Sequence, residues 1–203
     1  ERITANDEER QRQGFELQTV FEWATRNQAL DVRKGACSDD NGAILQLTYG
    51  PGATITRINK GLRRRANRRE LGFKINPVSG FWERTEAAEG DEGPDPTAIQ
   101  AQRIVPYVQD HKNALFFRPD TNHLPEKTVA TFQHAILRGI ETVYQLEEGE
   151  ILAEPLPSRS NRNGCLIYEA TEGGAGVLTR LVSEPDALAQ VARTALKIMH
   201  FDI

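Results

Sequence analysis

A stripe of basic side chains carries the clearest chemistry in this sequence. Residues 57–69 hold seven cations and no acid: Arg57, Lys60, Arg63, Arg64, Arg65, Arg68 and Arg69. Six of the seven are arginines, whose planar guanidinium can hold a phosphate through two parallel hydrogen bonds and can stack on bases. We therefore predict that this basic stripe (residues 57–69) binds nucleic acid, and we expect DNA to be the ligand. Two other interpretations stay open: ion pairs with the chain's own acids, and docking of a protein partner.

The net charge of the chain hides this stripe. The 203 residues include 25 Lys and Arg against 29 Asp and Glu, a net charge of -4. Without the seven cations of the stripe, 18 basic residues oppose 29 acids, a balance of -11. Residues 83–95 carry six acids and one arginine, so they form an acidic segment that could pair with the stripe or face a partner. The mild overall acidity therefore does not exclude a nucleic-acid partner.

A glycine-rich turn is the second candidate site. Residues 169–176 read Glu-Ala-Thr-Glu-Gly-Gly-Ala-Gly and join an expected strand to an expected helix. Glycines at such a turn allow positive φ angles, and the free N–H groups at a helix start can hold an anion. The motif lacks the Gly-Lys-Ser/Thr ending of a phosphate loop and the G-x-G-x-x-G spacing of dinucleotide-binding proteins. We assign Glu172, Gly173, Gly174 and Gly176 a structural or an anion-binding role.

Catalytic and metal-binding patterns are weak. The four histidines, His111, His123, His134 and His200, show no H-x-x-x-H or H-x-H spacing, so no metal site is expected. Cys37 is predicted to be a loop thiol, and Cys165, in an apolar strand, to be a core residue. No arrangement of nucleophile and base stands out. We expect the chain not to be an enzyme and to hold no cofactor itself.

The elements that position these residues change character along the chain. Short alternating or apolar runs predict strands at 15–24, 43–49, 53–59, 103–110 and 114–118, and a hairpin of 73–77 with 81–85. Gly50-Pro51-Gly52 and His111-Lys112-Asn113 are expected to separate neighbouring strands. Apolar residues spaced three and four apart predict a helix over 125–148 that ends at Gly149.

Two further strands and one or two helices are expected to complete the second half. The strands are predicted at 150–155 and 164–170, and the helical pattern of 177–200 is expected to break near Pro185. The fold class is therefore α+β, with an antiparallel, strand-rich first half and two to three helices packed on the sheet. We expect one domain over residues 1–203, with a strand-rich part at 1–120 and a helix-rich part at 121–203. No apolar run is long enough to cross a membrane, so a cytoplasmic location is expected.

Four segments together resemble a known family. Residues 2–16, 58–65 (Ile-Asn-Lys-Gly-Leu-Arg-Arg-Arg), 145–157 and 167–176 are similar to the MrfA-type zinc-binding (MZB) family. Its members are attached to superfamily-two helicases, and one of them is DrmB, a component of the DISARM phage-defence system. The resemblance extends over most of the chain, and the glycine-rich turn is its most specific element.

The resemblance implies an accessory module of bacterial DNA processing or antiviral defence, with DNA and a helicase domain or subunit as partners and no membrane. In this family four cysteines that follow the last helix bind zinc. The sequence ends at Ile203 without them, so zinc is expected only in a longer parent protein. The resemblance also makes the basic stripe a candidate contact to the DNA backbone. The alternative is a docking scaffold for a helicase subunit that does not touch DNA.

Overall fold

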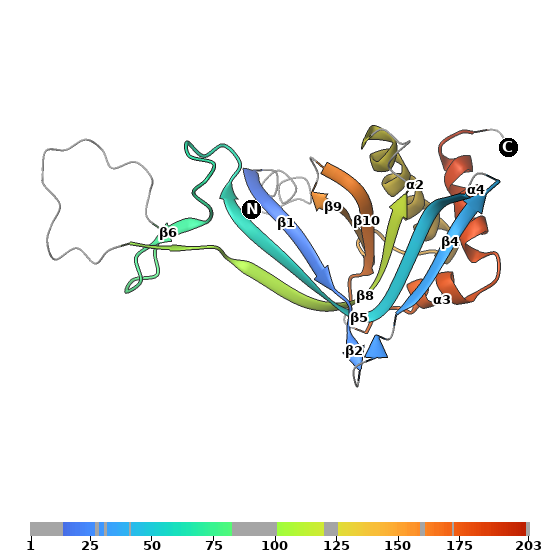
Figure 1. Cartoon of the computed structure of the whole chain (residues 1–203), viewed down its shortest axis with the longest axis horizontal. Coiled ribbons are helices and arrows are strands. Elements are labelled where there is room, and N and C mark those ends of the chain that lie inside the picture. Colours follow the sequence, from blue (N-terminus) through green and yellow to red (C-terminus); the bar gives the residue numbers. More distant parts are fainter. Residues whose placement is uncertain are drawn as a thin grey trace, which may run out of the picture. The chain divides into compact units, whose positions relative to one another are not determined.

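The computed structural model describes residues 14–26, 29–30, 32–40, 42–82, 101–119, 126–158, 161–171 and 173–201. Their contacts divide the chain into two compact units. Unit 1 comprises Glu1–Gln18 and Arg57–Val108, and unit 2 comprises Thr19–Thr56 and Gln109–Ile203. Strands dominate the first half and helices the second (Figure 1), which confirms the predicted α+β class. The prediction of one domain over residues 1–203, with parts 1–120 and 121–203, stays a prediction.

The main sheet is antiparallel wherever its register is described. Its order is β1-β5-β8-β10-β9, with β4 also paired to β5. Its members are β1 (Phe15–Glu22), β4 (Arg33–Asp39), β5 (Gly42–Leu62), β8 (Tyr107–Pro119), β9 (Ile151–Ser158) and β10 (Asn161–Glu169). Two small sheets pair β2 (Thr25–Arg26) with β3 (Ala29–Leu30) and β6 (Phe73–Ile75) with β7 (Gln102–Ile104). The exposed β4 was not predicted, because its sequence has no apolar alternation.

Two predicted breaks between strands were wrong. Strand β5 runs without interruption through Gly50-Pro51-Gly52, and β8 runs through His111-Lys112-Asn113. Gly52 adopts a φ of 61°, and its N–H donates to the side chain of Asn113 (3.2 Å). Gly50 leaves room for the Trp23 ring, which lies 2.6 Å from the place of a Cβ atom. Tertiary contacts thus accommodate residues that usually end a strand.

Three helices lie in unit 2. Helix α2 (Glu126–Tyr144) ends four residues before the predicted end. Gln145 has a φ of 53°, and the N–H of Leu146 donates to the carbonyl of Glu141 (2.9 Å). This pattern is a Schellman motif with Gln145 in the position that glycine usually takes, so the prediction that Gly149 ends the helix was wrong. The break near Pro185 is confirmed: α3 (Val177–Ser183) and α4 (Ala187–Ile198) flank it. No helix of the described part is long and apolar enough to cross a membrane.

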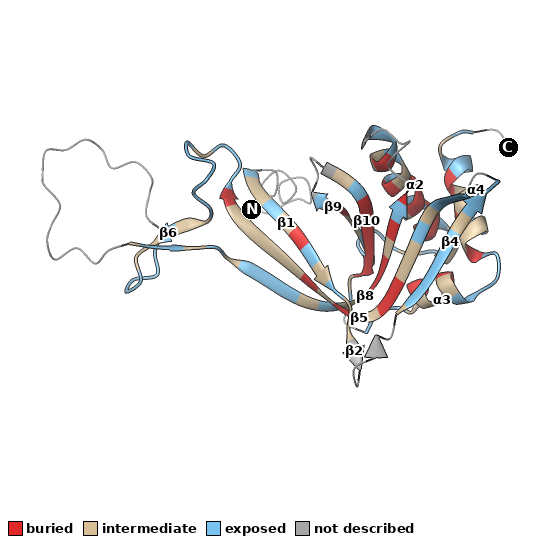
Figure 2. Cartoon of the chain, viewed as in Figure 1, coloured by how far each residue is buried: buried red, intermediate tan, exposed pale blue. Residues whose placement is uncertain are grey.

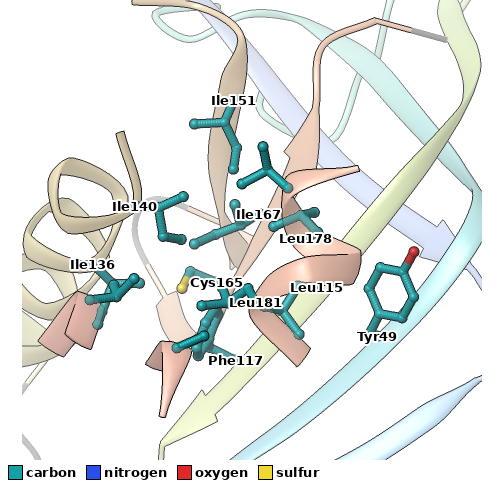
Figure 3. Packing of buried hydrophobic residues seen from close by; sticks show 13 residues of the cluster. Tyr49, Leu115, Phe117, Ile136, Ile140, Ile151, Cys165, Ile167, Leu178 and Leu181 are labelled. Atoms are coloured by element: carbon teal, nitrogen blue, oxygen red, sulfur yellow. The ribbon is translucent and has the colours of Figure 1, made fainter. Parts of the chain in front are cut away.

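The core of unit 2 follows from the alternation of strand residues. Leu115, Phe117, Cys165 and Ile167 point to one face of the sheet and pack against α2, α3 and α4 (Figure 3). Their neighbours Ala114, Leu166 and Tyr168 belong to a second cluster with Ala53, Ile55 and Leu156. Because successive side chains of a strand point to opposite faces, β10 is buried on both sides. The prediction that Cys165 is a core residue is confirmed, whereas Cys37 lies half-buried on β4 and not in a loop.

Unit 1 is built differently. Among its described residues only Gly61 is buried, and the rest are half-buried or exposed (Figure 2). The hairpin predicted around residues 78–80 is present up to its last described residue, Trp82, which forms a bridge with Ile75. Residues 83–85 of that prediction lie outside the described residues. Strand β6 also pairs with β7, which coincides with the start of the strand predicted at 103–110; this pairing was not predicted.

Candidate nucleic-acid interface

The basic stripe ends in a loop whose base is closed by two glycines. This arginine loop (residues 63–72) joins β5 to β6. The N–H of Gly72 donates to the carbonyl of Lys60 (2.8 Å). Gly61 has a φ of 105°, and a Cβ atom on it would lie 2.8 Å from the Gly72 carbonyl oxygen. Only a residue without a side chain permits this conformation and this close approach.

Arg65 holds the loop together from inside. Its side chain is 12% exposed and forms an ion pair with Glu16 at 2.7 Å. The same guanidinium donates to the carbonyls of Leu62 and Arg68, both at 2.9 Å. A guanidinium with three acceptors around it satisfies most of its donors within the chain. Arg65 therefore organises the loop and is poorly placed to bind phosphate itself.

Further polar contacts fix the second half of the loop. Asn67 accepts a hydrogen bond from the N–H of Arg69 (3.0 Å) and donates to the carboxylate of Glu70 (3.1 Å). Glu70 in turn pairs with Arg103 of β7, and Arg103 also donates to the carbonyl of Leu71 (3.3 Å). The loop thus has a defined shape before any partner binds, which lowers the entropy cost of binding.

The remaining cations of the stripe differ in exposure. Arg63, Arg64, Arg68 and Arg69 are exposed at the loop, whereas Arg57 and Lys60 are half-buried on β5. Arg63 makes one long contact to the carbonyl of Phe15 (3.5 Å). The structure therefore brings four exposed arginines together on one short loop and separates Arg65 from them by its internal contacts.

The described part of unit 1 is strongly basic. It contains nine basic residues and two acids, Glu16 and Glu70, whereas the full sequence of unit 1 has 13 basic residues and 12 acids. Glu16 and Glu70 already form ion pairs, with Arg65 and Arg103. The acidic segment 83–95, which the sequence offered as a counter-charge, lies outside the described residues. Within the described residues no further acid of this unit opposes the four exposed arginines.

The glycine-rich turn receives a carboxylate of the chain itself. Glu169 is 2% exposed, and its side chain accepts hydrogen bonds from the N–H of Leu178 at the start of α3 and from the amide of Asn113, both at 3.0 Å. Gly174, with a φ of 68°, packs so closely that a Cβ atom would lie 1.5 Å from this carboxylate. Gly173 and Gly176 also have positive φ angles, and Glu172 lies outside the described residues. The helix start is filled by Glu169, which favours the structural role of this turn over anion binding.

The cysteines do not fit a zinc site. The described residues hold no group of three His, Cys, Asp or Glu side chains that could bind a metal ion. Cys165 is completely buried in β10, where burial raises the pKa of its thiol from 9.0 to about 12. Zinc binds thiolates, so this cysteine is a poor ligand.

The match to a known family lies within unit 2. The antiparallel hairpin and three helices described above place this region in the α+β class, and residues 132–200 match the family described as MZB, the MrfA Zn-binding domain. This match confirms the resemblance seen in the sequence, over a shorter range that leaves out residues 2–16 and 58–65. No curated protein matches the chain.

A solved structure is also similar. Its description is "Crystal Structure of DUF1998 helicase MrfA bound to DNA". The likeness covers 93% of this chain and 21% of that helicase, at 12% identity and a TM-score of 0.49. The chain therefore spans about a fifth of the length of that protein.

Some contributors to the two sites were not predicted. Asn113 connects Gly52, Glu169 and the carbonyl of Gly173, and Glu16 anchors Arg65. Each acts on residues 48 or more positions away, so local patterns carry no signal for them. A side chain at Gly174 would collide with Glu169, five residues earlier. The need for glycine at this position is evident only when the strand and the helix are in place.

Proposed function

We propose that this chain is a non-catalytic, helicase-associated accessory domain in which the arginine loop of unit 1 binds the phosphate backbone of DNA. The single observation that carries the proposal is the group of four exposed arginines on a preformed loop of unit 1. Arginine–phosphate contacts of this kind give affinity that does not depend on sequence and falls with salt.

The helicase association rests on the family match of residues 132–200. In this proposal unit 2 is the scaffold, and the parent protein is a superfamily-two helicase or a DISARM-type defence protein whose helicase partner acts on the DNA. The absence of catalysis is supported by the glycine-rich turn, where Glu169 occupies the helix start that a phosphate would need. We expect no ATP hydrolysis by the 203-residue chain alone.

The proposal is tested with the variant R63Q/R64Q/R68Q/R69Q. DNA binding is measured by fluorescence anisotropy on single-stranded and duplex oligonucleotides at 50 mM salt. Removing four phosphate contacts is expected to lower affinity for both by at least tenfold. Glutamine keeps most of the side-chain volume, and all four residues are exposed, so folding should be unaffected.

A matched control removes the same charge from unit 2. Lys34, Arg118, Arg193 and Lys197 are exposed there, and K34Q/R118Q/R193Q/K197Q changes the net charge equally. If both quadruple variants lose the same affinity, the binding reflects net charge and the loop is not the site. If the wild-type chain does not bind DNA at low salt, the proposal is wrong. Nuclease-resistant co-purification with a helicase would then favour the docking scaffold.

A further inference from the structure

A row of aromatic rings lies in unit 1 beside the arginine loop. The ring of Phe15 contacts that of Phe73 edge-on, with centroids 5.9 Å apart, and Phe73 contacts Trp82 in the same manner at 4.8 Å. The row becomes more exposed toward its end. Trp82 is 57% exposed, and its neighbour Phe81 is 76% exposed. Large aromatic surfaces rarely stay open to water without a partner.

The exposed end of the row sits on an ordered turn. The side chain of Asn76 accepts hydrogen bonds from the N–H groups of Val78 (2.9 Å) and Ser79 (3.2 Å). The backbone of Asn76 pairs with the carbonyl of Phe81 (2.9 Å) and with the N–H of Gly80 (2.8 Å). An asparagine that closes a turn in this way fixes its geometry. Phe81 and Trp82 are therefore presented by a structured hairpin.

The other end of the row meets the arginine loop. The backbone N–H of Arg63 donates to the carbonyl of Gly14 (2.9 Å), and its guanidinium reaches the carbonyl of Phe15 (3.5 Å). Phe73 directly follows Gly72, the residue that closes the loop on Lys60. The arginine loop and the row of rings thus belong to one connected set of contacts within unit 1.

From this arrangement we infer that unit 1 binds single-stranded nucleic acid, with bases stacked on Trp82 and Phe81 and phosphates held by the exposed arginines. The inference rests on the proposed function and adds that the nucleic acid is single-stranded. Every base has a π face, so stacking on aromatic side chains beside a basic track is a sequence-tolerant way to bind single strands. In a duplex these faces are already covered by neighbouring bases. The four exposed arginines of the same unit favour a polyanion over an uncharged protein surface.

The test compares W82A and F81A with the wild-type chain on a fluorescein-labelled dT oligonucleotide and on a duplex of equal length. Loss of one stacked base is expected to lower single-strand affinity roughly 5- to 150-fold, with duplex affinity changed less than twofold. W82F should recover most of the binding, because it restores an aromatic face. F201A is the matched control, since Phe201 is 61% exposed in unit 2 and should not affect either ligand.

The outcomes separate this inference from the proposed function. If W82A and F81A bind the single strand as the wild type does, or weaken both ligands equally, the stacking inference is overturned, and the rings then suit a protein contact. If arginine substitutions still weaken binding in that case, the proposed function stands. If the wild type binds neither ligand, both fail. W82F also guards against misfolding: recovery in W82F with loss in W82A shows that the ring itself contributes.

Discussion

The two units of this chain bury their residues to very different degrees. Unit 2 has two clusters of buried side chains, one between its sheet and the helices and one on the other face of the sheet. Its most buried acid, Glu169, is hydrogen-bonded on both oxygens. In unit 1 the only buried described residue is Gly61, and an internal arginine, ion pairs and a row of rings define its shape. Hydrophobic burial dominates stability, whereas exposed apolar patches rimmed by polar residues mark interaction sites. We therefore expect unit 2 to supply the stability of the chain and unit 1 to supply the ligand contacts of the proposed function.

The largest effect should come from the tightest packing of unit 2. Gly174→Ala would place a Cβ atom on the Glu169 carboxylate and force alanine into a positive φ. We expect a loss of about 3–5 kcal/mol in the free energy of unfolding, measured by urea denaturation. Gly173→Ala is the control: it has a φ of 82° but no atom near the new Cβ, so it should cost only about 1–2 kcal/mol. Equal losses would show that Glu169 does not occupy the turn as described.

A smaller and local effect is expected in unit 1. Arg65→Gln removes the ion pair to Glu16 and the contacts to two loop carbonyls. Hydrogen bonds to charged groups contribute about 1.5–3 kcal/mol, so the amides of Arg63 and Gly72 should exchange with solvent roughly 10- to 150-fold faster. Hydrogen exchange measured by NMR checks this.

Arg64→Gln serves as the comparison for Arg65. Arg64 is exposed on the same loop, and its loss should leave amide exchange unchanged. The amides of β10 in unit 2 should keep their protection in both variants. Faster exchange at Ile167 as well as at Gly72 would mean that the two units do not open independently. That result would contradict the expectation that unit 2 is stable without the contacts of unit 1.

The smallest effect concerns pH and the core of unit 2. Burial raises the pKa of the Cys165 thiol to about 12 from an ordinary 9.0. The folded state therefore keeps a proton that the unfolded chain releases above pH 9, so this contribution to stability is complete below pH 9 and is lost as pH rises toward 12. At pH 10 the loss is about 1.4 kcal/mol.

Urea denaturation between pH 8 and pH 10 measures this contribution of the Cys165 thiol to the free energy of unfolding. The stability difference between the wild type and Cys165→Ala should shrink by that amount over the range, because alanine does not titrate. A difference between wild type and Cys165→Ala that stays constant with pH would show that the thiol is not buried as described.

The sequence predicted those parts of the fold that depend on local patterns. Helix α2 follows from apolar side chains three and four positions apart, and the helix break follows from Pro185 itself. The strands around Ile151 and Ile167 follow from short apolar runs. The full lengths of β5 and β8 were not predicted, because they depend on contacts between residues far apart in the sequence. Gly52 donates a hydrogen bond to Asn113, and Gly50 leaves room for the Trp23 ring. Long-range contacts of this kind overrule the residues that normally end a strand.

The candidate site was predictable to a similar extent. Charge counting along the chain finds the stripe, but it cannot separate Arg65 from Arg64, since the difference lies in the contact of Arg65 with Glu16, 49 positions earlier. It also gives no signal for the rings of Phe15, Phe73 and Trp82, which meet only when β6 is placed. Charge along the sequence therefore locates the candidate site, and only tertiary structure separates the exposed arginines from Arg65.

The salt dependence of single-strand binding tests the central claim most directly. For a single strand, the slope of log affinity against log salt changes by about 0.7 for each phosphate contact. Anisotropy titrations of the wild-type chain and of R63Q/R64Q/R68Q/R69Q from 50 to 200 mM salt should therefore give slopes that differ by about 3. The unit 2 control, K34Q/R118Q/R193Q/K197Q, should keep the wild-type slope. Equal slopes for the wild type and the arginine-loop variant would contradict the assignment of phosphate binding to the loop.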